Sequence, residues 1–228
     1  MKRSFAILMV VMCCVPPAAQ AEEVGRTTFE LPSAQWTLLT TFDTKPMFSG
    51  NRTGKSQPVG NKVFYLADAD GTIKALLRIA GENSRSGMVT WHSNCPEPKA
   101  GYFTKGLGSN RDGWIRECLI VSARFSPSRY FKPDSAVGKA VAEKQLEFFK
   151  AGYFLRSTYG SNAGAHLTVE LVARTDFKGL TDVRPSTDRT YEVPEELIAW
   201  GESLQKAVTS SVESFRGGLT LPPIEFKQ

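Results

Sequence analysis

The N-terminal segment is the feature that most constrains the fold, because its residue pattern indicates that it is not part of the folded domain. A positive start at residues 2–3, an uncharged apolar stretch over residues 5–15, two prolines and a small-x-small pattern at residues 19–21 follow in that order. This order is typical of a secretory signal peptide. The apolar stretch is shorter than the roughly 20 residues that span a bilayer. We predict cleavage between Ala21 and Glu22, and an uncleaved membrane anchor is the weaker alternative.

Removal of residues 1–21 changes the set of cysteines. Cys13 and Cys14 leave with the signal, and only Cys95 and Cys118 remain in residues 22–228, which we predict to form a single domain. In an oxidising compartment, two such cysteines most simply form a disulfide. Closing this loop is expected to stabilise the fold by about 3 kcal/mol. A lipoprotein acylated at Cys13 or Cys14 ranks lower, because the bulky Met12 precedes that site.

Export also lowers the net charge of the chain. Lys2 and Arg3 are removed, so 28 basic residues become 26 against 23 acidic ones, and the net charge falls from +5 to about +3. A charge this mild gives no case for a nucleic-acid partner. No later segment has the length and freedom from charge of a membrane span, so we expect no transmembrane segment in the mature chain.

Alternating apolar and polar residues predict a β-sheet with one dry face and one wetter face. The clearest unit is a hairpin of residues 63–67 and 72–80, joined at Asp70 and Gly71, for which a type I′ turn is predicted. The stretch 114–125 has apolar residues on both sides, as expected of a strand covered on both faces. Further strands are predicted at 27–31, 35–42, 87–94, 154–158 and 167–173, and residues 96–113 and 219–228 are predicted to be a loop and a tail.

Two segments have helical periodicity. The first runs from about 135 to 151 behind an N-cap at Asp134 or Ser135, and the second from about 194 to 216 with Pro194 in its first turn. Trp200 and Phe215 are expected to anchor the second helix. Strands, a helix, strands and a helix in this order favour an α+β fold, with a mostly antiparallel sheet and both helices packed on one face.

Two segments come close to ligand motifs without matching them. Residues 50–56 resemble a phosphate-binding loop, but they have three residues between the glycines where four are needed, and no helix pattern follows. Asp68 and Asp70 resemble the start of a calcium loop, but Ile79 occupies the position that needs a glutamate. We therefore predict no cofactor and no metal.

The chain has only two histidines, and His92 is the better candidate for a catalytic base. It lies close to Cys95, whereas His166 shares its strand face with Thr168 and Glu170 and is expected to be solvated. The sequence contains no G-x-S-x-G and no H-E-x-x-H pattern, so neither a nucleophile elbow nor a zinc site is predicted.

Glu117 is the other candidate, as an acid. It shares a predicted strand face with Leu119, and a buried carboxylate there needs a partner, for which Arg78 or Arg124 is expected. A structural ion pair is favoured over an acid catalyst. Residues 129–132 mix aromatic and basic side chains; we expect their rings to lie under the sheet edge, and contact with an anionic envelope surface is the alternative.

The sequence therefore favours a non-enzymatic binding or accessory protein of the cell envelope, located in the periplasm or secreted. Its partner is expected to be another envelope protein or a small ligand. The alternative is a secreted hydrolase whose site is assembled only in three dimensions. A pocket that joins His92 or Glu117 to a second titratable group would favour the hydrolase.

Overall fold

A computed structural model describes the part of the chain that forms the fold. The described residues are 21–33, 35–44, 59–82, 95–96, 102–107, 115–161, 165–177, 193–214 and 217–226. The predicted signal segment up to residue 20, the near-motif at 50–56, the predicted strand 87–94 with His92, and Phe215 lie outside the described residues. Among the described residues, no helix combines the length and apolar character needed to cross a bilayer.

The main element is a seven-stranded sheet in the order β3-β4-β5-β9-β8-β7-β6, in which all neighbours are antiparallel. This confirms the mostly antiparallel α+β fold. Its strands are β3 (Thr37–Thr44), β4 (Val59–Ala67), β5 (Ile73–Glu82), β6 (Tyr102–Leu107), β7 (Ile115–Phe125), β8 (Gly152–Ser161) and β9 (His166–Arg174).

A second, three-stranded sheet joins the two ends of the described chain. It contains β1 (Ala21–Val24), β2 (Thr27–Glu30) and β10 (Gly218–Thr220), in the order β1-β2-β10. β10 runs parallel to β2 and lies in the segment predicted to be a tail. Likewise, β6 lies in the segment predicted to be a loop. Both strands are short, which is why their sequences show little alternation.

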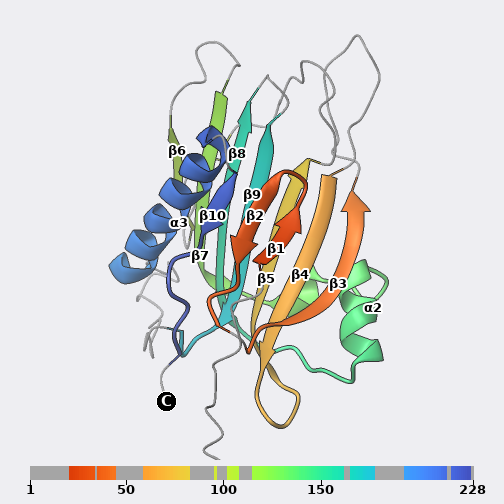
Figure 1. Cartoon of the computed structure of the whole chain (residues 1–228). Coiled ribbons are helices and arrows are strands. Elements are labelled where there is room, and N and C mark those ends of the chain that lie inside the picture. Colours follow the sequence, from red (N-terminus) through yellow and green to blue (C-terminus); the bar gives the residue numbers. More distant parts are fainter. Residues whose placement is uncertain are drawn as a thin grey trace, which may run out of the picture.

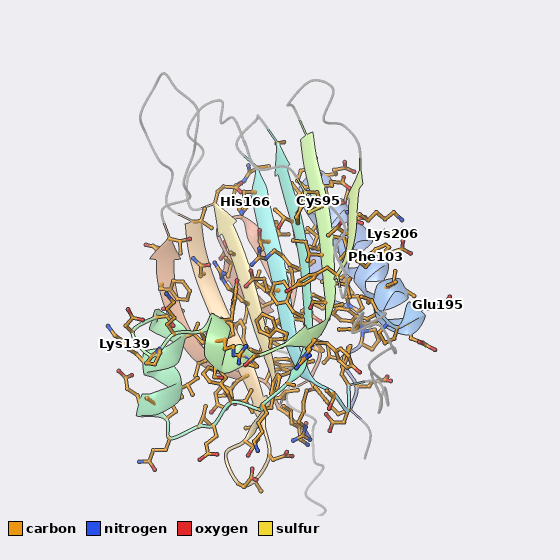
Figure 2. The ribbon with its side chains drawn as sticks, turned by 180° about the vertical axis from the view of Figure 1, so that it is seen from behind. Cys95, Phe103, Lys139, His166, Glu195 and Lys206 are labelled. Atoms are coloured by element: carbon orange, nitrogen blue, oxygen red, sulfur yellow. A yellow bond between two sulfur atoms is a disulfide. The ribbon has the colours of Figure 1, made fainter. Side chains whose placement is uncertain are left out.

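The helices lie on opposite faces of the large sheet, not on one face as predicted (Figures 1 and 2). Helix α3 (Glu195–Glu213) and the small sheet cover one face. Their apolar side chains form one cluster with Leu77, Leu119 and Leu155 of the large sheet. Helix α2 (Ala136–Glu143) packs on the other face with Val63, Leu76 and Val172. The order of elements along the chain does not state which face a helix takes, so this prediction was wrong.

Helix α2 is also shorter than the predicted 135–151. Ser135 is its N-cap and accepts a hydrogen bond from the Gly138 amide at 3.0 Å, as expected. The helix ends at Glu143, and Gln145 takes a left-handed φ of 55°. The chain then pairs with the start of β5, where the Ile73 amide donates to the Glu147 carbonyl at 2.9 Å. Phe149 is buried in the apolar cluster under α2.

The predicted hairpin is confirmed, but its turn is of another type. Gly71 has a φ of +86°, and its amide donates to the Asp68 carbonyl at 3.1 Å. Among the described non-glycine residues only Gln145 has a positive φ. Asp70 is therefore not left-handed, and a type I′ turn, which needs two such residues, is excluded. The Asp70 carboxylate instead accepts from the Thr72 amide at 2.9 Å.

Candidate functional site

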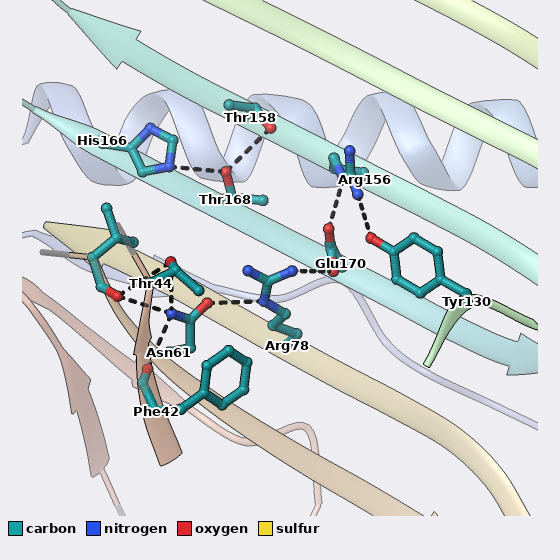
Figure 3. A network of polar contacts seen from close by, with 11 residues as sticks. Phe42, Thr44, Asn61, Arg78, Tyr130, Arg156, Thr158, His166, Thr168 and Glu170 are labelled. Carbon is teal, nitrogen blue, oxygen red and sulfur yellow. Dashed lines mark hydrogen bonds and ion pairs between the residues drawn. The ribbon is translucent and has the colours of Figure 1, made fainter. Parts of the chain in front are cut away.

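Three charged residues form a row across the middle of the large sheet, on the α2 side (Figure 3). Arg78 of β5 lies directly opposite Glu170 of β9, and Arg156 of β8 lies opposite the same glutamate on its other side. The antiparallel register thus brings two guanidinium groups to one carboxylate, although Arg78 and Glu170 are 92 residues apart in sequence.

The carboxylate of Glu170 is held by both arginines at once. Its side chain is only 2% exposed, whereas those of Arg78 and Arg156 are 22% and 30% exposed. Arg78 Nη1 lies 3.0 Å from Oε2, and Arg156 Nε lies 2.6 Å from Oε1. A buried carboxylate must be paired and hydrogen-bonded to be tolerated, and here each oxygen has its own charged donor.

Uncharged neighbours fix the position of Arg78. Its Nε donates to Asn61 Oδ1 at 2.9 Å. Asn61 is itself buried, and its Nδ2 donates to the carbonyls of Val59 at 2.8 Å and Phe42 at 3.1 Å. The guanidinium also lies 5.8 Å from the centre of the Phe42 ring. These contacts restrict the rotamers of Arg78 before any ligand arrives.

Arg156 is held in a similar way from the other side. Its Nη2 donates to the Tyr130 hydroxyl at 2.6 Å, and its guanidinium lies 5.1 Å from the centre of the Phe154 ring. Tyr130 ends the short helix α1 (Pro127–Tyr130) and is 40% exposed. Burial, together with the Glu170 carboxylate, raises the pKa of the Tyr130 hydroxyl, so it is neutral at pH 7.

A row of hydroxyl groups and one imidazole lies beside the charged row. Thr158 and Thr168 face each other across β8 and β9 with their Oγ1 atoms 3.2 Å apart, and Thr168 Oγ1 lies 3.2 Å from His166 Nε2. Burial, with a smaller effect of the Arg78 charge, lowers the pKa of His166 to about 4. His166 is therefore neutral at pH 7. It is half-buried, whereas a solvated side chain was expected.

These two rows line a depression of about 250 Å³ on the sheet face. Thr44, Val59 and Ala80 also line it. Among the described lining residues, two arginines and one glutamate leave a charge of +1, since the others are uncharged at neutral pH. A polar, concave, positively charged surface of this kind is suited to binding an anion.

A second ion-pair cluster, at the end of β9, has a balanced charge. Arg174 contacts Asp68 at 2.6 Å and Asp176 at 2.7 Å, and Lys74 contacts Asp68 at 2.7 Å. Hydrogen bonds from Lys74 and Arg174 lower the pKa of Asp68. Two cations and two anions leave no surplus, so this cluster needs no ligand. These ion pairs occupy the carboxylate of Asp68, one of the residues that resembled the start of a calcium loop. Among the described residues, no group of three or more metal-binding side chains is found.

Glu117 lies on the opposite face of the sheet, against α3. Burial raises the pKa of its carboxyl group, a hydrogen bond with the Thr209 side chain opposes this effect, and the Glu213 charge adds to it. Neither expected partner is there: Arg78 bonds Glu170 on the other face, and Arg124 is exposed. The structure does not bring Glu117 to the arginine row, and His92 lies outside the described residues.

The predicted disulfide is present. Cys95 and Cys118 are bonded with their Cα atoms 5.3 Å apart. Cys118 lies in β7 opposite Gly106 of β6. A Cβ at position 106 would lie 3.2 Å from the Cys95 Cβ, so the absence of a side chain there leaves room for the bridge.

Sequence reasoning missed the arginine row because its members are dispersed. Arg78, Arg156 and Glu170 each occupy a polar position in an alternating strand, which on its own indicates a solvated face. Only the pairing of β5, β9 and β8 brings them together. Comparisons with protein-family models, curated proteins and solved structures find no match for this chain.

Proposed function

We propose that this chain is an exported, non-enzymatic binding protein of the cell envelope that takes up a small anionic ligand at Arg78 and Arg156. The observation that carries the proposal is the surplus charge of the depression: two half-buried arginines share one buried carboxylate. A half-buried charge without a counter-charge is unfavourable, and an anion from solution would supply one.

The arginines retain donors for such an anion. Arg78 uses Nε and Nη1 in its hydrogen bonds, and Arg156 uses Nε and Nη2. Within the described part of the chain, Nη2 of Arg78 and Nη1 of Arg156 carry no hydrogen bond. Guanidinium groups are weakly hydrated and match the planar shape of oxyanions, so these nitrogens are suitable ligands for a carboxylate or phosphate.

The hydrolase alternative gains less support from the geometry. Glu117 bonds the hydroxyl of Thr209, and the described residues place no second titratable group within hydrogen-bond reach of it. A general acid with no partner base does not make a catalytic pair. The binding function therefore agrees better with the described residues.

Export is supported by the signal pattern of residues 1–21 and by the disulfide, which is typical of proteins that fold in an oxidising compartment. The full chain should be expressed in a bacterial host and released by osmotic shock. We expect an intact mass that begins at Glu22 and shows no free thiol at Cys95 or Cys118. A protein that keeps Met1 and two free thiols would contradict export.

Binding is tested by following the melting temperature of the purified mature chain against acetate, phosphate, glucuronate and glucose 6-phosphate. At a ligand concentration of 100 Kd we expect about 2.7 kcal/mol of stabilisation, which corresponds to an increase of about 5–10 °C. Arg156→Gln should abolish the increase, because it leaves a neutral Arg78–Glu170 pair that still folds. Lys105→Gln is the matched control: it removes the same charge on the other face, where Lys105 pairs with Glu202 at 2.6 Å. If the ligand raises the melting temperature of Arg156→Gln as much as that of Lys105→Gln, the arginine row is not the binding site.

A further inference from the structure

We infer that the ligand is a hydroxylated monocarboxylate, in its chemistry a sugar acid, held by its carboxylate at the arginine pair and by its hydroxyls at Thr158 and Thr168. This inference rests on the proposed anion-binding function and specifies the ligand class. It follows from the charge of the depression, the shape of its donors and the hydroxyl row beside them.

The charge of the site favours a monoanion. Its described lining residues give the depression a surplus of one positive charge, because Glu170 is built into its wall and neutralises one arginine. A carboxylate would bring the site to neutrality. A phosphate monoester, which carries nearly two charges at pH 7, would exceed the surplus and place its second charge close to the fixed Glu170 carboxylate, where like charges repel.

The position of the donors favours a planar acid group beside the hydroxyl row. Figure 3 shows Arg78 between Glu170 on one side and Thr168 with His166 on the other. Because Nη1 of Arg78 is directed at Glu170, its Nη2 is the nitrogen left for a ligand that lies over the threonines. A carboxylate bound at this nitrogen has the hydroxyl row within the same depression.

The hydroxyl row itself suits ligand hydroxyls. Each threonine hydroxyl offers one donor and two acceptor lone pairs, and the contacts in the chain Thr158–Thr168–His166 use only part of this capacity. His166 is neutral, so it adds no charge to attract a second anionic group. The depression, at about 250 Å³, lies below the range of roughly 300–1,000 Å³ usual for drug-sized ligands, which indicates one small molecule.

The test is calorimetric titration of the mature chain with glucuronate, galacturonate, gluconate, glucose, glucose 6-phosphate and acetate. We expect the three hydroxylated acids to bind at least about ten-fold tighter than acetate and glucose, since each good hydrogen bond adds about a factor of ten. Thr158→Val and Thr168→Val should each weaken glucuronate about ten-fold and leave acetate unchanged. Arg156→Gln should remove binding of all the acids.

The outcomes separate this inference from the proposed function. If glucose 6-phosphate binds more tightly than the hydroxylated acids and depends on Arg156, the inference is overturned and anion binding stands. If acetate matches glucuronate, or the threonine variants weaken both equally, the hydroxyl row has no role and the inference is likewise overturned. If no compound binds the wild type differently from Arg156→Gln, both proposals fail. Circular dichroism of each variant checks that it is folded.

Discussion

The two faces of the large sheet use alternate residues of the same strands for opposite purposes. In β5, Leu77 and Ile79 face α3 with no exposed surface, and Arg78 between them faces the depression. In β9, Val169 and Leu171 flank Glu170 in the same way. Each large apolar side chain buried on the α3 face contributes about 1.5–3 kcal/mol. The α3 face thus stabilises the fold through these apolar positions, and the other face combines the apolar cluster under α2 with the charged row.

Glu117 and Glu170, one on each face, show a similar contrast. Glu117 lies on the α3 face without a cationic partner among the described residues, and burial raises its pKa. Glu170 lies on the other face between two arginines. Burial thus disfavours the charged form of the carboxylate on the α3 face, whereas the carboxylate on the other face is paired with two cations. The difference is one of neighbours, since both side chains project from the interior of a strand.

The largest expected effect tests the apolar packing on the α3 face. Trp200→Ala should lower the free energy of unfolding by about 3–5 kcal/mol, because it removes a buried aromatic ring. Trp200 is 4% exposed, lies 5.5 Å from the Phe177 ring and donates from Nε1 to the Pro223 carbonyl at 2.8 Å. A urea melt measures the loss, with the exposed Lys206→Ala on the same helix as control, within about 0.5 kcal/mol of wild type. A loss under about 1 kcal/mol would contradict the packing.

The next effect tests the charged face. Glu170→Gln should lower the free energy of unfolding by about 3 kcal/mol, because two half-buried arginines lose their only counter-charge in the row. Glu202→Gln is the matched control, since Glu202 pairs with Lys105 but is 43% exposed. An exposed pair contributes under about 1 kcal/mol. Equal losses in the two denaturant melts would mean that the row is no more than a surface ion pair.

The free energy of unfolding should also depend on pH, through His166 on the face that holds the charged row. The folded-state pKa of His166 is about 4 against an ordinary value of 6.5. As the pH falls, the His166 imidazole therefore takes up a proton in the unfolded chain before it does so in the folded protein. The contribution of neutral His166 to the free energy of unfolding is complete above pH 6.5 and is lost as the pH falls towards 4. The whole effect is about 3 kcal/mol.

The raised pKa values of Glu82 and Glu117, both due mainly to burial, act in the opposite direction. The difference in unfolding free energy between wild type and His166→Gln cancels these shared contributions. Wild type should lose stability relative to the variant between pH 6.5 and 4, measured by urea melts at each pH. A difference that does not change with pH would show that His166 titrates normally in the folded protein.

The smallest expected effect tests the α3 face again. Ser157 is fully buried there, and its hydroxyl has no hydrogen-bond partner among the described residues. Ser157→Ala should therefore be neutral or stabilising by up to about 1 kcal/mol. Ser211→Ala is the control, because the equally buried Ser211 donates to the Gly217 carbonyl at 3.2 Å and should lose about 1 kcal/mol. Thermal melts that rank the two variants in reverse order would contradict this assignment.

Sequence patterns predicted the local elements of the fold well. The alternation in β5, the N-cap at Ser135 and the apolar stripe of α3 depend on neighbours within a few residues, and all are confirmed. The position of the turn at Gly71 is also confirmed, but its predicted type is not. The disulfide was predicted by elimination of other roles for Cys95 and Cys118, and it is present.

The long-range arrangement of helices and strands could not be predicted from such local patterns. The helices were expected on one face because nothing in the sequence of α2 or α3 states which side of the sheet it covers. The predicted helix 135–151 was too long, since its periodicity continues through Phe148 and Phe149 while packing against β5 ends it. The arginine row depends on the register of three strands, and no local pattern encodes that register.

The small sheet has a consequence for the order in which the chain can fold. β2 lies close to the predicted cleavage site, and its parallel partner β10 is formed by Gly218, Leu219 and Thr220 near the other end of the sequence. Phe29 of β2 and Leu219 of β10 are both buried in the apolar cluster under α3. A chain threaded through a membrane N-terminus first would present β2 long before β10 arrives. Under the proposed export, final closure of this cluster would thus wait until β10 had crossed the membrane, and translocation would set the order of these folding steps.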